Sequence, residues 1–262
     1  MELKDAHVLV TGASRGIGAG LAREFHRAGA RVTLLARSTG PLEELAAELG
    51  GTAITADLDD PAVLDGLIAR IEAQAGPIDV LANNAGVDVT GAFAEMSAKE
   101  LHDLLALNVL APMELTRQVL PGMIARGRGH LLATSSLAGT AVLPGLVAYS
   151  ASKSALTHFM AGVGGELRGL PIGTTVIEVG LIPTDMKDSV LHYAPTAAAF
   201  KRFYRLGLLC DTPIERVCRS SVSAVASGRR HVRFPRRARA FPLFSETPRR
   251  MAEIILSGVP PR

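Results

Sequence analysis

Short apolar runs rich in Val, Leu and Ile alternate along this chain with longer stretches in which apolar residues recur at helical spacing. Strands that are apolar on both faces are typical of a parallel sheet buried between two layers of helices. The pattern therefore predicts a Rossmann-type, doubly wound α/β fold, with a mostly parallel sheet and helices on both faces. The runs cover residues 7–10, 31–36, 53–56, 80–83, 130–135 and 174–179.

Glycine and proline positions predict where the first two helices lie. The helix after the first strand is expected to begin near Ile17 and to end before Gly29, a residue type that favours the position just past a helix. Pro41 marks the start expected for the second helix. No repeat or linker interrupts the sequence before about residue 213, so one domain is expected over residues 1–262.

Residues 131–152 contain no charged side chain, which is about the length of a membrane-spanning helix. Ser135, Ser136, Gly139, Pro144 and Gly145 interrupt this stretch. We therefore expect a buried strand, an uncharged loop and the start of a helix.

The two cysteines, Cys210 and Cys218, belong to no C-x-x-C pair and to no metal-ligand pattern, so neither a disulfide framework nor a metal site is predicted. The N-terminus carries acidic residues, and its first apolar run is too short for a signal peptide. A cytoplasmic location is therefore expected.

Charge is divided unevenly along the chain. Residues 1–215 hold 17 Lys and Arg against 23 Asp and Glu, a net of −6, whereas residues 216–262 hold 11 Arg against two Glu, a net of +9. A basic segment is therefore expected over residues 229–262, where Arg236, Arg237 and Arg239 lie near phenylalanines. Such a segment suits weak contact with an anionic membrane surface or an acidic substrate, and equally suits a subunit contact or a solvated face. Nucleic-acid binding is not expected, because a charge run alone is not a binding fold.

A glycine-rich loop, T-G-A-S-R-G-I-G over residues 11–18, joins the first strand to the first helix. Glycines here allow a pyrophosphate to approach the helix N-terminus closely. The G-x-x-x-G-x-G spacing resembles the cofactor loop of the classical short-chain dehydrogenase/reductase family. The resemblance implies dinucleotide contacts from Gly12, Ser14, Arg15, Gly16, Ile17 and Gly18.

Tyr149 and Lys153 are spaced to share one face of a helix. A lysine charge near a phenol favours the phenolate, so we expect Lys153 to lower the pKa of Tyr149. Ser136 lies thirteen residues upstream at a strand end, where the neighbouring Ser135 is expected to be the capping residue. The spacing of Ser136, Tyr149 and Lys153 is similar to the active site of the same family, in which Asn108 would complete a tetrad through an ordered water and Tyr149 and Lys153 also contact the cofactor.

Further positions extend the resemblance over residues 8 to about 186. Asn84, Ala85 and Gly86 belong to an N-N-A-G signature, and Asp57 with Leu58 matches the adenine-contacting position. After the sixth strand the family usually has P-G, where this chain has Val179-Gly180. Contacts to the nicotinamide end are expected from Gly180, Ile182 and Thr184.

The end of the second strand predicts which dinucleotide is bound. Members that bind NAD place an Asp there, whereas this chain has Ala36 and Arg37. Arg37 and Arg15 resemble the basic pair that holds the 2′-phosphate of NADP. NADP(H) is therefore expected, with NAD(H) as the less favoured alternative.

The resemblance implies an oxidoreductase that interconverts a carbonyl and a secondary alcohol by direct hydride transfer, without a metal. A bulky apolar substrate is expected beneath a lid formed by residues 183–212, with contacts from Ser136, Leu143, Tyr149 and Met186. A non-catalytic dinucleotide sensor or scaffold is the alternative from another class, and it would not need Ser136, Tyr149 and Lys153 together.

A homodimer or homotetramer is expected through helices near residues 101–119 and 150–167. Leu156, Met160, Val163 and Leu167 follow a spacing that places them on one helix face. The alternative is that this stripe packs on the sheet of its own subunit.

Overall fold

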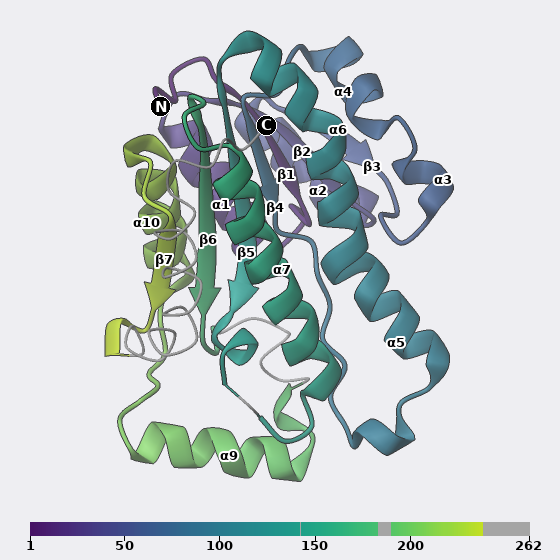
Figure 1. Cartoon of the computed structure of the whole chain (residues 1–262), viewed down its shortest axis with the longest axis vertical. Coiled ribbons are helices and arrows are strands. Elements are labelled where there is room, and N and C mark those ends of the chain that lie inside the picture. Colours follow the sequence, from purple (N-terminus) through teal and green to yellow (C-terminus); the bar gives the residue numbers. More distant parts are fainter. Residues whose placement is uncertain (142, 183–189, 238–262) are drawn as a thin grey trace.

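The structure, a computed structural model, describes residues 1–141, 143–182 and 190–237. These residues contain one parallel sheet in the order β3-β2-β1-β4-β5-β6-β7, drawn in Figure 1. The doubly wound α/β prediction is confirmed. The strands are β1 (His7–Thr11), β2 (Arg31–Ala36), β3 (Thr52–Thr55), β4 (Val80–Asn83), β5 (Gly129–Ser136), β6 (Ile172–Val179) and β7 (His231–Phe234).

Strand β1 shows why the apolar runs are continuous. All five of its residues are buried. Val8 and Val10 belong to one apolar core, whereas Leu9, which points to the other face of the sheet, belongs to a second core. Both faces of the strand are therefore covered, so neither face favours polar residues.

Two groups of helices supply those cores. The first core contains residues of α1 (Gly16–Arg27), α2 (Thr39–Leu49) and α10 (Ile214–Ser227), and the second contains residues of α4 (Leu67–Ala75), α6 (Ala111–Arg126) and α7 (Val147–Glu166). Outside these layers, α9 (Ala194–Arg205) lies at the end of the molecule near the carboxyl ends of β5 and β6 (Figure 1). Further helical elements among the described residues are α3 (Pro61–Leu64), η1 (Phe93–Glu95), α5 (Ala98–Leu105), η2 (Ala106–Leu110) and η3 (Leu137–Gly139).

The helix ends agree with most of the sequence expectations. Gly29 follows α1 with a φ of +85°, as expected of a residue just past a helix. Helix α2 begins at Thr39, two residues before Pro41. The uncharged stretch divides into β5, η3, a loop and the start of α7, as predicted. Across the described ranges, every helix is too short or too polar to span a bilayer.

The apolar stripe on α7 faces the sheet. Leu156, Met160 and Leu167 are each 3% exposed or less and belong to the second core together with Leu131 and Val176. The expectation that this stripe forms a subunit contact is therefore wrong. The spacing of apolar residues could not distinguish the two cases, because a sheet and a second subunit both select an apolar helix face.

Candidate functional site

A cleft of about 520 Å³ opens at the carboxyl edge of the sheet, where β1, β4, β5 and β6 end. Gly18, Asp57 and Asn108 do not line it, and Thr184 and Met186 lie outside the described residues. The cleft is thus where the sequence motifs placed it. The expected site residues that line it are Gly12, Ser14, Arg15, Gly16, Ile17, Arg37, Leu58, Asn84, Ala85, Gly86, Ser136, Leu143, Tyr149, Lys153, Gly180 and Ile182.

Backbone crowding explains the glycines of the first loop. Gly12 has a φ of +64°, and a Cβ there would lie 2.8 Å from the Cα of Ala85. A Cβ on Gly18 would collide with the carbonyl oxygen of Gly12, so Gly18 allows the helix to pack against the loop. Gly16 and Ile17, in the first turn of α1, line the cleft and give it the anion-binding character of a helix N-terminus.

Side-chain hydrogen bonds tie the strand ends together beneath this loop. The Thr11 hydroxyl oxygen accepts hydrogen bonds from the backbone N–H groups of Asn84 and Ala85, both at 3.0 Å. The Asn84 amide nitrogen donates to the Thr11 carbonyl at 3.1 Å, and its Oδ1 accepts from the Thr134 hydroxyl at 3.0 Å. Asn84 therefore joins the ends of β1, β4 and β5.

Arg37 stands at the far end of the cleft, at the end of β2. Its guanidinium lies 3.5 Å from Asp59 Oδ2 and 4.0 Å from Asp57 Oδ1. Ser38, which our sequence analysis missed, also lines this end, and within the described part of the chain its hydroxyl makes no capping bond to α2. The signal that could have found it is a hydroxyl directly after Arg37 at a strand end. Arg15, Arg37 and Ser38 are suited to binding a phosphate.

Ser136 and Tyr149 meet at the middle of the cleft. They are hydrogen-bonded through their side chains. The Ser136 hydroxyl also accepts a hydrogen bond from the Ala138 N–H at 3.1 Å and donates to the Val179 carbonyl at 3.2 Å. Ser136 is therefore the residue that caps the following turn, and the expectation that Ser135 does so was wrong.

Burial dominates the protonation of Tyr149 and Lys153. It raises the pKa of Tyr149 to about 12, although the hydrogen bond with Ser136 acts in the opposite direction. It lowers the pKa of Lys153 to about 8. The Lys153 Nζ lies 5.8 Å from the centre of the Tyr149 ring and donates to the Thr134 carbonyl at 3.0 Å. The expected lowering of the Tyr149 pKa by Lys153 is therefore wrong for this structure, because desolvation of the phenolate is the largest influence on that pKa.

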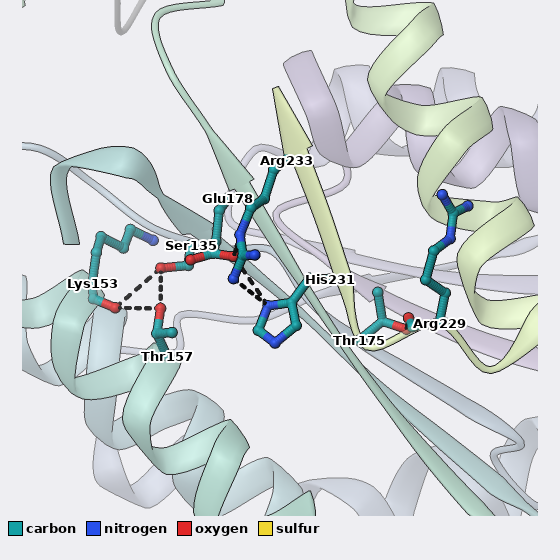
Figure 2. A network of polar contacts seen from close by, with 8 residues as sticks. All are labelled: Ser135, Lys153, Thr157, Thr175, Glu178, Arg229, His231 and Arg233. Carbon is teal, nitrogen blue, oxygen red and sulfur yellow. Dashed lines mark hydrogen bonds and ion pairs between the residues drawn. The ribbon is translucent and has the colours of Figure 1, made fainter. Parts of the chain in front are cut away.

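Two hydroxyls fix the backbone of α7 at Lys153 (Figure 2). The Ser135 and Thr157 hydroxyls both donate to the Lys153 carbonyl oxygen, at 3.0 and 2.9 Å. From the turn after β5, Gly139 approaches the same peptide group, since a Cβ on it would lie 3.0 Å from the Lys153 carbonyl carbon. The register of the catalytic candidates on α7 is thus set by contacts with β5 and η3.

A second polar group holds the last two strands together (Figure 2). Glu178 is fully buried, and its Oε2 accepts a hydrogen bond from Arg233 Nε at 2.6 Å. His231 Nδ1 lies 3.0 Å from the same oxygen. These contacts attach β7 to β6 beside Val179 and Gly180, which line the cleft.

Asn108 lies in the π-helical turn η2. Its Oδ1 accepts from the Val87 N–H at 2.9 Å, and its Nδ2 donates to the Val87 carbonyl and the Ser152 hydroxyl, at 2.8 and 3.1 Å. A Cβ on Gly86 would lie within 2.9 Å of Asn108 Oδ1 and 3.2 Å of Lys153 Nζ. Asn108 and Lys153 therefore both reach the side of Gly86 on which a side chain would stand.

The other end of the cleft is apolar and partly enclosed by α9. The Thr196 hydroxyl donates to the Pro144 carbonyl at 2.6 Å, and Gly145, with a φ of +78°, packs directly against the Tyr193 ring. These contacts join α9 to the loop before α7. The described residues lining this end include Leu137, Leu143, Leu146, Leu181, Val190, Phe200, Phe203, Leu208 and Leu209.

The chain is similar to known proteins over most of its length. A family model described as short chain dehydrogenase matches residues 6–193. Dehydrogenase/reductase SDR family member 7B of Mus musculus is 37% identical over 193 residues, which make up 70% of this chain and 60% of the mouse protein. The match thus spans about three fifths of that relative's own length.

Two solved structures have the same fold. A short-chain dehydrogenase from Sphingobium yanoikuyae in complex with NADPH is 26% identical, with a TM-score of 0.79 over 97% of this chain and 96% of that chain. A short chain dehydrogenase/reductase from Burkholderia phymatum in complex with NAD is 22% identical, with a TM-score of 0.79 over 99% and 98% of the two chains. At that identity the second likeness concerns the fold alone.

Proposed function

Because this chain belongs to the short chain dehydrogenase family, we propose that it is an NADP(H)-dependent oxidoreductase that interconverts a carbonyl group and a secondary alcohol. The observation that carries the proposal is the convergence of Ser136, Tyr149 and Lys153 in one cleft, with Tyr149 hydrogen-bonded to Ser136. A protein that only binds a dinucleotide would need the loop around Gly12 but not these three side chains.

The residues present fit a bound dinucleotide, which supplies a hydride donor or acceptor at its nicotinamide ring. The glycine loop and the N-terminus of α1 are suited to its pyrophosphate, and Lys153 to its nicotinamide ribose. Ser136 would donate a hydrogen bond to the substrate oxygen, where charge changes during the reaction. The raised pKa of Tyr149 keeps the phenol protonated at neutral pH, so Tyr149 Oη would give its proton to that oxygen during reduction. Oxidation uses the same groups in reverse, with Asn108 as part of the proton path.

A preference for NADPH is the second part of the proposal, supported by Arg15 at the start of α1 and by Arg37 and Ser38 at the end of β2. Arg37→Ala should weaken NADPH binding by about tenfold or more and leave NADH binding nearly unchanged, because a charge-assisted bond contributes about 1.5–3 kcal/mol. Dissociation constants from fluorescence titration measure the effect. Arg23→Ala is the matched control, since Arg23 pairs with Glu48 on the outer surface of α1 and α2. Tighter binding of NADH by the unmodified chain would overturn this preference.

The test of the activity is a screen of ketones, aldehydes and secondary alcohols with both dinucleotides, followed by nicotinamide absorbance. The apolar end of the cleft favours substrates with bulky apolar groups. We expect consumption of NADPH with at least one carbonyl compound. Tight dinucleotide binding without turnover of any compound would instead favour a sensor or scaffold.

Self-association is proposed through the outer faces of α5, η2 and α6. Leu110 is 57% exposed between α5 and α6, where an apolar side chain is suited to a subunit contact. Light scattering should show a dimer or tetramer, and Leu110→Arg should shift it towards the monomer. A monomer at micromolar concentration of the unmodified chain would reject the assembly.

A further inference from the structure

Helix α9 has two chemically different faces. Its inner face carries Phe200, which is 6% exposed, and Phe203, and both line the apolar end of the cleft. Its outer face carries Lys201, Arg202 and Arg205, all exposed. The helix thus separates the apolar end of the cleft from a basic outer surface.

Leu206 extends that outer surface with an apolar side chain. It follows Arg202 by four residues, its N–H bonds to the Arg202 carbonyl at 3.0 Å, and Gly207, with a φ of +68°, ends the helix directly after it. Leu206 is 65% exposed, the largest value among the exposed large apolar side chains of the described residues. We call Lys201, Arg202, Arg205 and Leu206 the lid patch.

The segment that contains the lid patch is strongly basic. Residues 190–237 contain ten Lys and Arg, including the three of the patch, against two acids, Asp211 and Glu215. Asp211 accepts a hydrogen bond from the Tyr204 hydroxyl at 2.6 Å. Arg237, which follows β7, reaches the carbonyl of Gly207 at 3.5 Å and so adds its charge beside the patch. An exposed leucine among cations matches a surface that is anionic outside and apolar beneath.

The lid patch is close in sequence to residues that line the apolar end of the cleft. Helix α9 lies at one end of the molecule (Figure 1), and Leu208 and Leu209, which follow the patch after Gly207, line the apolar end of the cleft. We propose that the lid patch docks on an anionic lipid surface and turns the apolar end of the cleft towards it, so that an apolar carbonyl or alcohol enters from the lipid. The delivery of substrate rests on the proposed function, whereas the docking does not.

The docking is tested by sedimenting the full chain with phosphatidylcholine vesicles that do or do not contain phosphatidylglycerol. We expect binding to the anionic vesicles alone, weakening as salt screens exposed charges over a Debye length of about 8–10 Å. Leu206→Gln, and separately the combined change Lys201→Gln, Arg202→Gln and Arg205→Gln, should each weaken vesicle binding at least tenfold. The matched control is Leu170→Gln, because Leu170 is 36% exposed and lies just before β6, at the opposite edge of the sheet.

Four results would overturn the proposal. The unmodified chain could fail to bind anionic vesicles, the lid-patch variants could bind as well as the unmodified chain, or Leu170→Gln could lose as much binding as they do. Binding to a soluble acidic protein in place of vesicles would also overturn it, and would identify a protein partner for the patch.

A parallel assay separates this proposal from the proposed activity. Turnover of a small water-soluble ketone should be the same in the lid-patch variants and the unmodified chain, because these side chains lie outside the cleft lining. Turnover of a long-chain ketone held in anionic vesicles should fall with vesicle binding. If vesicle binding depends on the patch but no ketone is reduced, the docking stands and the proposed function fails.

Discussion

The two ends of the cleft are built in different ways. At the dinucleotide end, backbone groups of β1 and β4 are fixed by the Thr11 hydroxyl and the Asn84 amide, and glycines form the wall because a Cβ would collide. At the substrate end the wall consists of apolar side chains from α9 and from the loops that follow β5, β6 and α9. Described bonds made by these segments include Thr196 to Pro144 and Gly91 to Gly145.

This difference explains what each end demands of the sequence. A position at which only glycine fits, or a bond that only a hydroxyl or amide can make, restricts the residue type. An apolar wall accepts many combinations of Leu, Val and Phe of similar volume. The dinucleotide end is therefore visible as a motif, whereas the substrate end is compatible with many side-chain combinations that keep the fold.

The largest effect is expected where the two ends meet. Tyr149→Phe should lower turnover by at least about a hundredfold, the usual scale for loss of a general acid, while the dissociation constant of NADPH changes little. Stopped-flow turnover and fluorescence titration measure the two quantities. If turnover stays within a few-fold of the unmodified chain, Tyr149 is not the acid. A large loss of NADPH binding would show that the two ends are not separable at this residue.

Replacing Lys153, which lies where the two ends of the cleft meet, tests the comparison through the free energy of unfolding. Its pKa falls from 10.5 to about 8 on burial, so the unfolded chain binds more protons between these values. The unfavourable contribution of the buried ammonium is thus complete below pH 8 and disappears as the pH rises to 10.5. Lys153→Met should raise the free energy of unfolding by about 2 kcal/mol at pH 7, after allowance for the lost bond to Thr134.

Thermal melts at pH 7 and pH 10.5 measure this change, with exposed Lys4→Met as the control. The increase in the free energy of unfolding of Lys153→Met should be smaller at pH 10.5 than at pH 7. Its activity should be lost at both pH values. A variant that is less stable than the unmodified chain at pH 7 would contradict the assignment.

A smaller effect is expected at the substrate end. Leu143 is 6% exposed and lines the apolar wall, so Leu143→Ala enlarges it. For a series of ketones of increasing chain length, the kcat/KM of long-chain ketones relative to that of short-chain ketones should rise by about tenfold. NADPH affinity should stay constant. An altered NADPH affinity would mean that the two ends are coupled.

The sequence predicted the sheet because its strands are buried on both faces. It predicted the cleft because Gly12 and Ser136 lie at strand ends and Tyr149 lies near the start of the helix that follows Ser136. It did not reveal which of two adjacent serines caps the turn, since both are hydroxyls and only the strand pleat decides which one faces Tyr149. The sequence also did not allow the pKa of Tyr149 to be predicted, because that pKa depends on how deeply α7 is buried. Likewise, the stripe from Leu156 to Leu167 contains no information about which surface covers it.

Gly139 makes the active site vulnerable at a position that carries no chemistry. One added methyl group would press on the Lys153 peptide from 3.0 Å, while the Ser135 and Thr157 hydroxyls hold that peptide from other directions. The strain would be relieved by a shift of a few tenths of an ångström in α7. A misplacement of about 1 Å in a catalytic group can cost a hundredfold in rate, so a smaller shift should still lower turnover. An inherited Gly139→Ala change could thus reduce the activity while every polar side chain of the site remained intact. In a natural population such a variant would pass any inspection of the active-site motifs and be found only by assay.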